Sequence, residues 1–276
     1  MAIVTISQQV GSGGSEIGLA LAERLGYCFV DHERFLERTQ RYGLDAHRLR
    51  HLEQEPPSLF ERFDHETRRY IAVIQAVLFE IAAEDRAVVV GRGGQWLLRD
   101  VPHAARVRVM APVAFRVDEL TIALSAHGGE RMSAQLAGQF VHRDDTQRLK
   151  RMRYLFNVDL NDPALYHLVM NTAGLSRLAA VDVLLTLVGQ PAFETSEHGR
   201  QMVADRLLAS RVEVALASHP ATRRYQMEVK AAGGVATLVG NAAALDSADE
   251  ATRGVPGLRE LKTVPVETPP VPPFVG

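Results

Sequence analysis

The stretch VTISQQVGSGGSEIG, from Val4 to Gly18, decides the predicted fold. It begins with a short β-branched run, which is typical of a buried strand, and continues into glycines. Apolar residues at helical spacing follow from Ser15 to Leu25, Gly26 is a plausible helix stop, and YCFVD returns to a strand pattern. A strand, a glycine loop, a helix and a second strand in this order predict the start of an α/β fold.

The glycine loop has the placement of a nucleotide phosphate loop but lacks its lysine. Such a loop reads GxxxxGK[ST]: its backbone N–H groups hold phosphates, its lysine reaches the terminal phosphates, and its hydroxyl binds Mg²⁺. Here Gln8 replaces the first glycine, Gly13 matches the second, Gly14 replaces the lysine and Ser15 keeps the hydroxyl. Backbone anion binding is expected, without the lysine's charge. The alternative is a glycine turn that packs a helix tightly on a strand.

Composition excludes several classes of protein. The chain has 276 residues, 46% of them hydrophobic and 23% charged, as in an ordinary globular protein of one large or two smaller domains. A formal net charge of −2 gives no field that would attract nucleic acid, and no window approaches the roughly 18 apolar residues of a membrane helix. The single cysteine, Cys28, excludes an internal disulfide framework and is expected in the core. Without a signal-peptide pattern, we expect a cytoplasmic protein.

The α/β pattern continues to about residue 190. Residues 34–84 are predicted to be mostly helical with a break at Pro56 and Pro57. Further elements follow in chain order: strands in AVVVGRGG and ARVRVMAP, helices in PVAFRVDELTIAL and from Val141 to Phe156, a strand in ALYHLVMNT and a helix in LSRLAAVDVLLTLV. The pattern breaks between residues 189 and 199, so we predict one domain over residues 1–190 and another over 200–268.

The second domain is predicted to be small and α+β. A helix from Gln201 to Ala217 precedes YQMEVKAAGGVATLVGNA, whose alternation on both sides of Gly233 and Gly234 predicts a hairpin. A short helix from Ala243 to Arg253 and a strand in LRELKTVPVE complete an αββαβ order. Residues 269–276 form a proline-rich tail that is expected to be extended or disordered.

Three motifs give the first domain a family resemblance. VTISQQVGSGGSEIGLALAERLGY, VVVGRGGQWLLRDVPH and NVDLNDPALYHLVMNT, in this order, resemble the cytidylate kinase-like family. The resemblance covers residues 1–188 and implies a P-loop kinase fold, a parallel sheet flanked by helices, with ATP and Mg²⁺ as cofactors and a nucleotide as the acceptor. Gly14 is typical of the family, whereas many members carry arginine at the position of Ser15. The implied donor-phosphate site is the loop itself: Gly11, Ser12, Gly13, Gly14 and Ser15, with Ser15 also the candidate Mg²⁺ ligand.

The resemblance also implies arginines around the reacting phosphates. Gly91 and Arg92 match a Gly-Arg-Asp that contacts the monophosphate in cytidylate kinases, while Gly93 replaces the aspartate. HRDDTQRLKRMR resembles a lid segment in which Arg143 and Arg148 would close over the transferring phosphate. The alternatives are that Arg92 bonds loop carbonyls and that the lid helix is a solvated, salt-bridged face.

The remaining candidate residues are Asp31, which has two interpretations, and His167 and the lid arginines, which have one each. Asp31, at a strand end, either binds a substrate group or hydrated Mg²⁺, or caps the helix that follows. His167, inside a predicted strand, is expected to be a core histidine. Arg151 and Arg153 are further cationic candidates on the predicted lid.

The second domain resembles a BON domain. The resemblance is carried by VEVALASHPAT, YQMEVKAAGGVATLVGNA and ATRGVPGLRELKTVPVE. BON domains are small interaction modules associated with membrane surfaces, lipids or proteins, so a protein or lipid partner is expected here.

Two functions follow from the sequence. The first is transfer of the ATP γ-phosphoryl group to CMP, dCMP or a related acceptor. The second is a catalytically weak or inactive nucleotide sensor on a kinase fold, which is favoured by Gly14, Ser15 and Gly93 because each departs from the working pattern.

Overall fold

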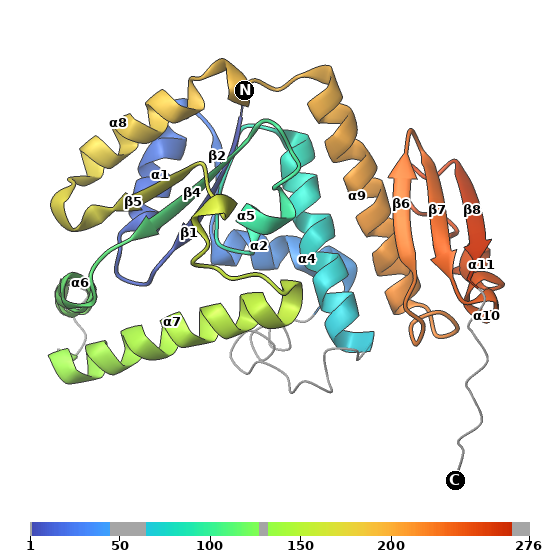
Figure 1. Ribbon diagram of the computed structural model, residues 1–276, viewed down its shortest axis with the longest axis horizontal. Helices are drawn as coiled ribbons and strands as arrows, with labels where there is room; N and C mark the ends of the chain where they lie inside the picture. Colours follow the sequence, from blue (N-terminus) through green and yellow to red (C-terminus); the bar gives the residue numbers. More distant parts are fainter. Residues whose placement is uncertain (1, 45–64, 127–131, 267–276) are drawn as a thin grey trace, which may run out of the picture.

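A five-stranded parallel sheet forms the centre of the larger part of the molecule (Figure 1). The computed structural model describes residues 2–44, 65–126 and 132–266, so the predicted break at Pro56 and Pro57 and the proline-rich tail lie outside the described residues. The strands have the order β2-β3-β1-β4-β5 and these bounds: β1 (Ile3–Gln8), β2 (Cys28–Val30), β3 (Ala87–Val90), β4 (Ala104–Met110) and β5 (Leu168–Asn171). Every neighbouring pair is parallel, which confirms the predicted sheet and gathers the carboxyl ends at one edge.

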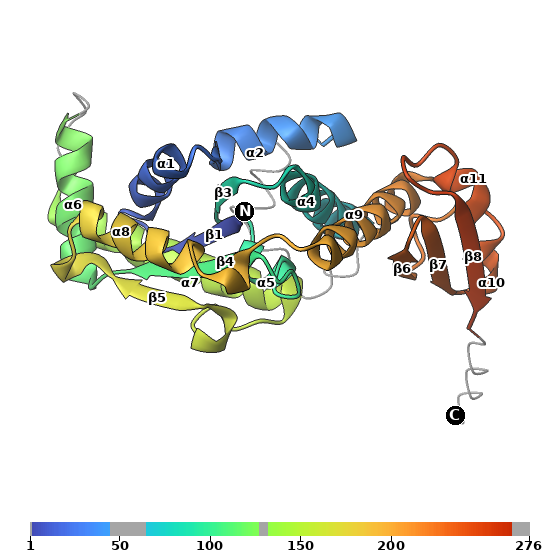
Figure 2. The same ribbon diagram turned by 90° about the horizontal axis from the view of Figure 1, so that it is seen from above.

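Helices cover both faces of this sheet, which is why its strands are apolar on both sides (Figure 2). Val4, Ile6 and Val107 pack toward α1 (Gly14–Leu25) and α8 (Arg177–Val188). On the opposite face, Ile3 and Val89 pack toward α4 (His65–Glu84) and α5 (Gly94–Leu97). The remaining elements of this part are α2 (His32–Thr39), α6 (Val113–Ala126), α7 (Ala134–Phe156) and the short 3₁₀ helices η1 (Gln40–Tyr42), η3 (Pro163–Leu165), η4 (Thr172–Gly174) and η5 (Pro191–Phe193).

The helix α7 is fixed at both ends by local chemistry. The Ser133 hydroxyl accepts a hydrogen bond from the Leu136 N–H, so α7 begins at Ala134 and not at Val141 as predicted. It ends at Asn157, whose φ of 54° is left-handed. Figure 1 shows α7 running along the sheet edge where β1 and β4 end.

Three sequence predictions about individual positions were wrong. Only Leu168–Asn171 of ALYHLVMNT forms a strand, because Asp162 caps the 3₁₀ turn that precedes it. His167 is therefore exposed just outside β5, where its Nδ1 accepts a hydrogen bond from the Arg106 N–H at 3.0 Å. Cys28 is also exposed, because β2 is an edge strand.

A second, three-stranded sheet follows the helix α9 (Glu197–Ser218). Its order is β6-β7-β8, with antiparallel β6 and β7 and parallel β7 and β8. The predicted hairpin is confirmed: Gly233 and Gly234 connect β6 to β7 with φ of 52° and 86°, which glycine adopts without strain. The single short helix predicted after the hairpin is two helices. The bounds are β6 (Glu228–Ala232), β7 (Val235–Gly240), α10 (Ala242–Leu245), α11 (Ala248–Thr252) and β8 (Glu260–Pro265).

The helix α9 lies between the two sheets (Figures 1 and 2). On one side its Arg211 forms an ion pair of 3.0 Å with Glu80 of α4. On the other side Val212 packs in one core with Leu238 of β7, and Asp205 accepts a hydrogen bond from the Gly233 N–H at 2.8 Å. The predicted boundary between residues 189 and 199 stays a prediction, and the helix directly after it contacts both parts.

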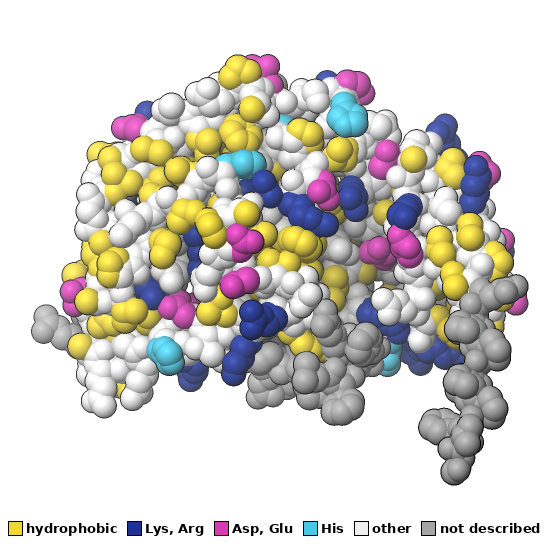
Figure 3. Space-filling view, in the orientation of Figure 1, with side chains coloured by type: hydrophobic (Ala, Val, Ile, Leu, Met, Phe, Trp, Pro, Cys, Tyr) yellow, Lys and Arg dark blue, Asp and Glu magenta, His cyan; other side chains and the backbone are white. Residues whose placement is uncertain are grey.

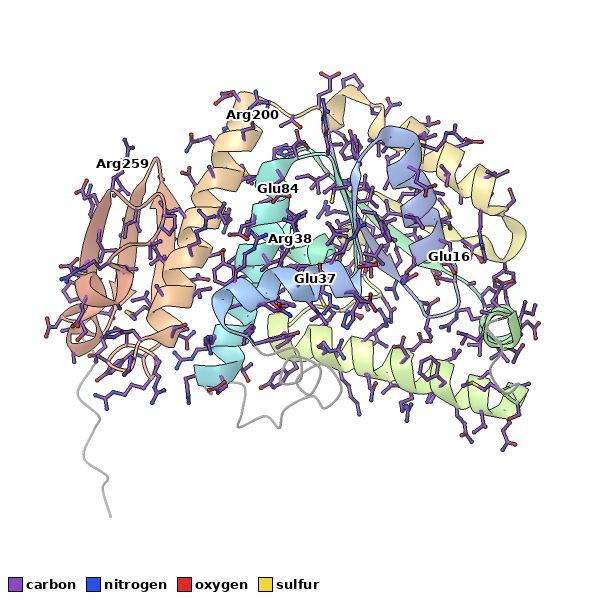
Figure 4. The ribbon with its side chains drawn as sticks, turned by 180° about the vertical axis from the view of Figure 1, so that it is seen from behind. Glu16, Glu37, Arg38, Glu84, Arg200 and Arg259 are labelled. Carbon is purple, nitrogen blue, oxygen red and sulfur yellow. The ribbon has the colours of Figure 1, made fainter. Side chains whose placement is uncertain are left out.

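The larger part exposes hydrophobic side chains on one side and carries an ion pair between two helices on the other. Figure 3 shows hydrophobic side chains over the region of α8 and β5. Leu178 of α8 and Val169 of β5 are exposed. From behind, Figure 4 shows Arg38 of α2 directed at Glu84 of α4, with two hydrogen bonds of 2.7 and 2.9 Å. Within the described residues no single helix is long and apolar enough to cross a membrane, although the bent pair Arg177–Val188 and Pro191–Ser218 reaches that length and composition together.

Glu213 of α9 gives the fold a dependence on pH. Burial raises the pKa of its carboxyl from the ordinary 4.5 to about 7, against the weaker effect of Arg206. Because the folded state holds this proton more tightly than the unfolded state, the contribution to stability is lost as pH rises from about 5 through about 7. Glu213→Gln is therefore expected to match the wild type near pH 5 and to exceed its free energy of unfolding at pH 8 by up to about 3 kcal/mol.

Urea denaturation at the two pH values measures this difference. Glu197→Gln is the matched control, because Glu197 lies on the same helix with its side chain 85% exposed. An equal gain for Glu213→Gln at pH 5 and pH 8 would contradict the assignment.

Candidate active site

The glycine loop between β1 and α1 presents unpaired backbone donors. Gly11 and Gly13 have φ of 77° and 78°, and this left-handed backbone turns the chain so that α1 begins at Gly14. The backbone N–H groups of Gly14, Ser15 and Glu16 donate to no acceptor among the described residues. The first turn of a helix with free N–H groups favours an anion, so the loop has the chemistry of a phosphate site.

Neighbouring side chains hold this loop in shape. The Ser12 hydroxyl is buried and donates toward the carbonyls of Gln9 and Val109, at 2.7 and 3.3 Å. The Thr172 hydroxyl in turn donates to the Ser12 carbonyl at 2.8 Å. The role of Ser12 as a phosphate ligand stays a prediction, and its hydroxyl is engaged by the protein.

Gln8 occupies the space beside Gly14, where a phosphate loop carries its lysine. The Gln8 amide Nε2 donates to the Ser15 hydroxyl at 2.7 Å. A Cβ atom added at Gly14 would lie 2.6 Å from Gln8 Oε1 and 2.7 Å from Gln8 Cβ. The absence of a side chain at residue 14 is therefore what lets Gln8 reach Ser15.

This contact predicts that substitutions at residues 8 and 14 are coupled. Gly14→Ala is expected to lower the free energy of unfolding by about 1–3 kcal/mol, because the new methyl group overlaps the Gln8 side chain. In a Gln8→Ala background most of that loss should disappear. A double-mutant cycle by urea denaturation measures the coupling, and purely additive effects would show that the two side chains do not compete.

A cavity of about 820 Å³ opens beside the loop. It brings together most of the charged residues predicted from the sequence, from four separate segments. The polar and charged lining comprises Ser7, Gln8, Ser15, Asp31, His32, Arg92, Gln95, Arg143, Asp144, Gln147, Arg148 and Arg151. Apolar side chains of α4 and α7 close its sides: Tyr70, Ile71, Ile74, Phe140, Met152, Leu155 and Phe156.

Arg92 enters the cavity from the end of β3. It has a φ of 62° between two left-handed glycines, Gly91 and Gly93, and a non-glycine residue in this conformation is uncommon and strained. Burial, followed by the charges of Arg151 and Arg148, lowers the pKa of the Arg92 guanidinium to about 10. An arginine held in this way favours an anion beside it. Gly91 also lines the cavity, and the acceptor site predicted for Gly91 and Arg92 stays a prediction.

The α7 helix supplies three more arginines to the same cavity. Arg143, Arg148 and Arg151 all line it. The Arg148 Nε donates to Asp144 one turn earlier at 2.6 Å, which fixes the direction of its side chain. The structure therefore places the predicted lid arginines in the same cavity as Ser15 and Arg92, although their roles stay predictions.

Both interpretations of Asp31 have a structural counterpart. Its carboxylate caps α2 by accepting a hydrogen bond from the Arg34 N–H at 2.9 Å. The same residue lines the cavity and opposes the lowering of the Arg92 pKa. Helix capping is shown, and substrate binding by Asp31 stays a prediction.

A buried ion pair links the lid helix to the glycine loop. Arg116 of α6 is 2% exposed and donates to both carboxylate oxygens of Asp145, at 3.0 and 2.7 Å. Its Nε also donates to the Ala111 carbonyl at 3.0 Å, and its Nη1 to the Val10 carbonyl at 3.5 Å. One guanidinium thus connects β4, the glycine loop and α7.

Sequence reasoning missed three residues of this region: Gln8, Arg108 and Arg116. Gln8 was noted only as a departure from the loop pattern, and nothing in its position suggested a bond to Ser15. Arg108 and Arg116 lie in an apolar strand and a helix that carried no motif. The available signal was the charged Arg108 inside an otherwise apolar strand, because a charged residue is rarely buried without a specific role.

The donor set is compatible with Mg²⁺ that is held mainly by phosphates. Among the described residues no group of three or more His, Cys, Asp or Glu side chains could hold a metal alone. The cavity does offer hard oxygen atoms, from the Ser15 hydroxyl and the Asp31 carboxylate. Mg²⁺ usually takes one or two protein oxygens together with phosphates and water, so these two residues would suffice.

The sequence of this chain matches a known protein family and several individual proteins. The model of the cytidylate kinase-like family matches residues 3–174. A cytidylate kinase of Saccharolobus islandicus (strain L.S.2.15) is 24% identical over 186 residues, which cover 67% of this chain and 89% of that protein. A cytidylate kinase of Natronomonas pharaonis is 28% identical over 177 residues, which cover 63% of this chain and 82% of that protein.

Solved structures resemble the chain more distantly. A shikimate kinase from Bacteroides thetaiotaomicron has 15% sequence identity and a TM-score of 0.43, over 68% of this chain and 99% of that one. The family match ends at Gly174, so α8, α9 and the second sheet lie beyond it.

Proposed function

The chain belongs to the cytidylate kinase-like family, and on that basis we propose that it transfers the γ-phosphoryl group of ATP to a nucleoside monophosphate, CMP or dCMP. The observation that carries the proposal is the cavity in which the loop residue Ser15 meets Arg92 of β3 and Arg148 of α7. The glycine loop, the end of β3 and α7 are distant in sequence, and each contributes one group to this cavity that is suited to binding an anion. Such an arrangement is suited to a phosphate donor and a phosphate acceptor at the same time.

The residues have separate tasks in this reaction. The free N–H groups at the start of α1 hold the donor phosphates, while Arg92 holds the acceptor phosphate. An acceptor oxygen forms a bond to the γ-phosphorus as the bond to the bridging oxygen of ADP breaks. Arg148 stabilises the charge on the transferring group. Mg²⁺, with Ser15 and Asp31 as its protein ligands, would neutralise phosphate charge when it is bound.

A coupled assay with ATP, Mg²⁺ and a panel of CMP, dCMP, UMP, AMP and GMP tests the proposal. We expect turnover with CMP or dCMP and much less with the purine acceptors. Turnover restricted to another acceptor would overturn the CMP assignment but not the kinase assignment. Because the reaction needs ATP, we place it in the cytoplasm.

A second candidate, a nucleotide sensor, is favoured by one contact. The Ser15 hydroxyl, which should bind Mg²⁺ in an active loop, already accepts a hydrogen bond from Gln8 at 2.7 Å. Saturable binding of ATP or CMP by calorimetry, with no product from any acceptor, would support the sensor over the kinase.

We also propose that residues 200–268 act as a BON-like interaction module for a protein or lipid partner. Support comes from the observed order of helix α9, hairpin β6 and β7, short helices α10 and α11 and strand β8, and from the edge position of β8, which carries the exposed Val264. Cosedimentation with phosphatidylglycerol vesicles tests the lipid alternative. Loss of cosedimentation in Val264→Lys would assign it to β8, and no binding to vesicles would leave the protein partner.

A further inference from the structure

Arg108 is a buried cation without an acidic partner. It lies on β4 opposite Ser7 of β1 and is 6% exposed. Its Nη1 donates to the Ser7 hydroxyl at 2.7 Å, and among the described residues no carboxylate lies within 4 Å of its guanidinium. Asp145 contributes an attractive charge to Arg108, but both of its carboxylate oxygens are bound by Arg116.

A buried, unpaired cation lowers the stability of the ligand-free protein. Taking an ion out of water costs several kcal/mol unless an opposite charge and hydrogen bonds compensate it. Burial indeed lowers the pKa of the Arg108 guanidinium, and the positive charge of Arg148 lowers it further. An apolar residue would fill this strand position at lower cost, as Val107 and Val109 do on the opposite face. The arginine therefore needs a reason that lies outside the ligand-free fold.

Ser7 connects this charge to the cavity. Ser7 lines the cavity together with Gln8, Ser15 and Arg148. The Ser7 oxygen accepts the hydrogen bond from Arg108, and its own O–H group is hydrogen-bonded to the Tyr166 hydroxyl, which donates in turn to the Leu160 carbonyl. A phosphate in the cavity would take the Ser7 proton from Tyr166, because an anion is a stronger acceptor than a neutral phenol. A hydroxyl polarised by a cation is a better donor to an anion than an isolated serine.

We propose that Arg108, acting through Ser7, supplies the positive charge that the lysine-free glycine loop lacks, and so positions a phosphate anion in the cavity. Arg108 is a positioning residue in this scheme, and Ser7 is the residue that touches the phosphate. The inference rests on the proposed function only in taking that phosphate to be part of a nucleotide. Arg92 and Arg148 add charge from loops and from the lid, whereas Arg108 is fixed on the sheet itself.

The experiment uses inorganic tripolyphosphate as the probe, since it carries the phosphate charge without a base or a sugar, and no acceptor is added that could take up a phosphoryl group. Its affinity for the full chain is measured by calorimetry for the wild type, Arg108→Gln, Arg108→Lys and Ser7→Ala. Arg108→Gln is expected to weaken binding by about tenfold to a hundredfold, as for the loss of a hydrogen bond to a charged group. Arg108→Lys should recover part of the affinity, and Ser7→Ala should remove most of the effect of Arg108→Gln in the double variant.

Thermal unfolding separates this role from a structural one. The ligand-free Arg108→Gln protein should unfold at the same temperature as the wild type or higher, because an uncompensated buried charge is gone. Its stabilisation by tripolyphosphate should be reduced. A structural arginine would give the opposite pattern, with a lower unfolding temperature and an unchanged rise on adding the probe, and that result would overturn the inference.

Arg106→Gln is the matched control. Arg106 lies two residues earlier on the same strand and face, its Nη2 contacts His167 Nε2 at 3.1 Å, and it does not line the cavity. This variant should bind tripolyphosphate within about twofold of the wild type. An equal loss in Arg106→Gln would overturn the inference by showing that any charge on β4 has the effect.

The other possible results distinguish failure of the proposed kinase function from failure of the proposed role of Arg108. A wild type that binds tripolyphosphate but transfers no phosphoryl group would contradict the kinase and leave the role of Arg108 standing, provided that Arg108→Gln loses affinity. Active transfer with an unaffected Arg108→Gln variant would overturn the inference alone. A wild type that binds neither tripolyphosphate nor ATP would overturn both.

Discussion

Arg148→Ala is expected to lower kcat for phosphoryl transfer by about 1000-fold, with a small change in KM for the acceptor. Arg148 lines the same cavity as Ser15 and Arg92, and its side chain is directed by the hydrogen bond from its Nε to Asp144. Because the glycine loop has no lysine, arginines from other segments must stabilise the charge that develops on the transferring group. Losing one of them therefore destabilises the transition state more than the bound substrate. Steady-state kinetics with ATP and the preferred monophosphate measure the effect.

Arg153→Ala is the control for this prediction. Arg153 is exposed on the same helix and does not line the cavity, so its removal should leave kcat within about twofold. A decrease of less than tenfold for Arg148→Ala would show that Arg148 does not act on the transferring phosphate.

The second large effect is expected for stability. Arg116→Met should lower the free energy of unfolding by about 3–5 kcal/mol, because it leaves the Asp145 carboxylate partly buried without its partner. The same substitution removes the hydrogen bonds to Val10 and Ala111, and so loosens α7 from the glycine loop. Urea denaturation of the ligand-free protein measures the loss.

An exposed ion pair provides the comparison for Arg116. Arg24 and Asp182 lie 3.6 Å apart with side chains 55% and 64% exposed, so Arg24→Ala should cost less than about 1 kcal/mol. In addition, Arg116→Met combined with Asp145→Leu should be less destabilised than Arg116→Met alone. If the double variant is the less stable one, the cost of Arg116→Met does not come from an unpaired carboxylate.

The sequence was sufficient for the fold because its signals are local. β1 and α1 were recognisable from one apolar run, the glycines that follow it and helical spacing, and Gly233 and Gly234 marked the hairpin of β6 and β7. Errors arose where a neighbouring element decided the outcome. ALYHLVMNT reads as one strand, yet Asp162 and Pro163 turn the first half into η3. Cys28 looks buried, yet β2 has a neighbour on one side only.

The site was predictable in part for a similar reason. Ser15, Arg92 and Arg148 stand in motifs, so the sequence predicted that they act together, and all three line one cavity. Their binding of phosphate stays a prediction. Gln8 and Arg108 depend instead on registers and contacts that a sequence does not contain. Nothing in the sequence says that Arg108 pairs with Ser7, because 101 residues separate the two positions along the chain.

The contact between Gln8 and Gly14 constrains how this loop can change by mutation. A lysine at residue 14 would meet the Gln8 side chain before it reached any phosphate, so Gly14→Lys as a first step produces a strained loop rather than a restored one. Gln8→Gly as a first step removes the bond to Ser15 without supplying charge. Either single step is expected to be worse than both the starting loop and the finished lysine loop. Substitutions at residues 8 and 14 are thus expected to show epistasis, so that a change from one loop type to the other requires both positions to change together.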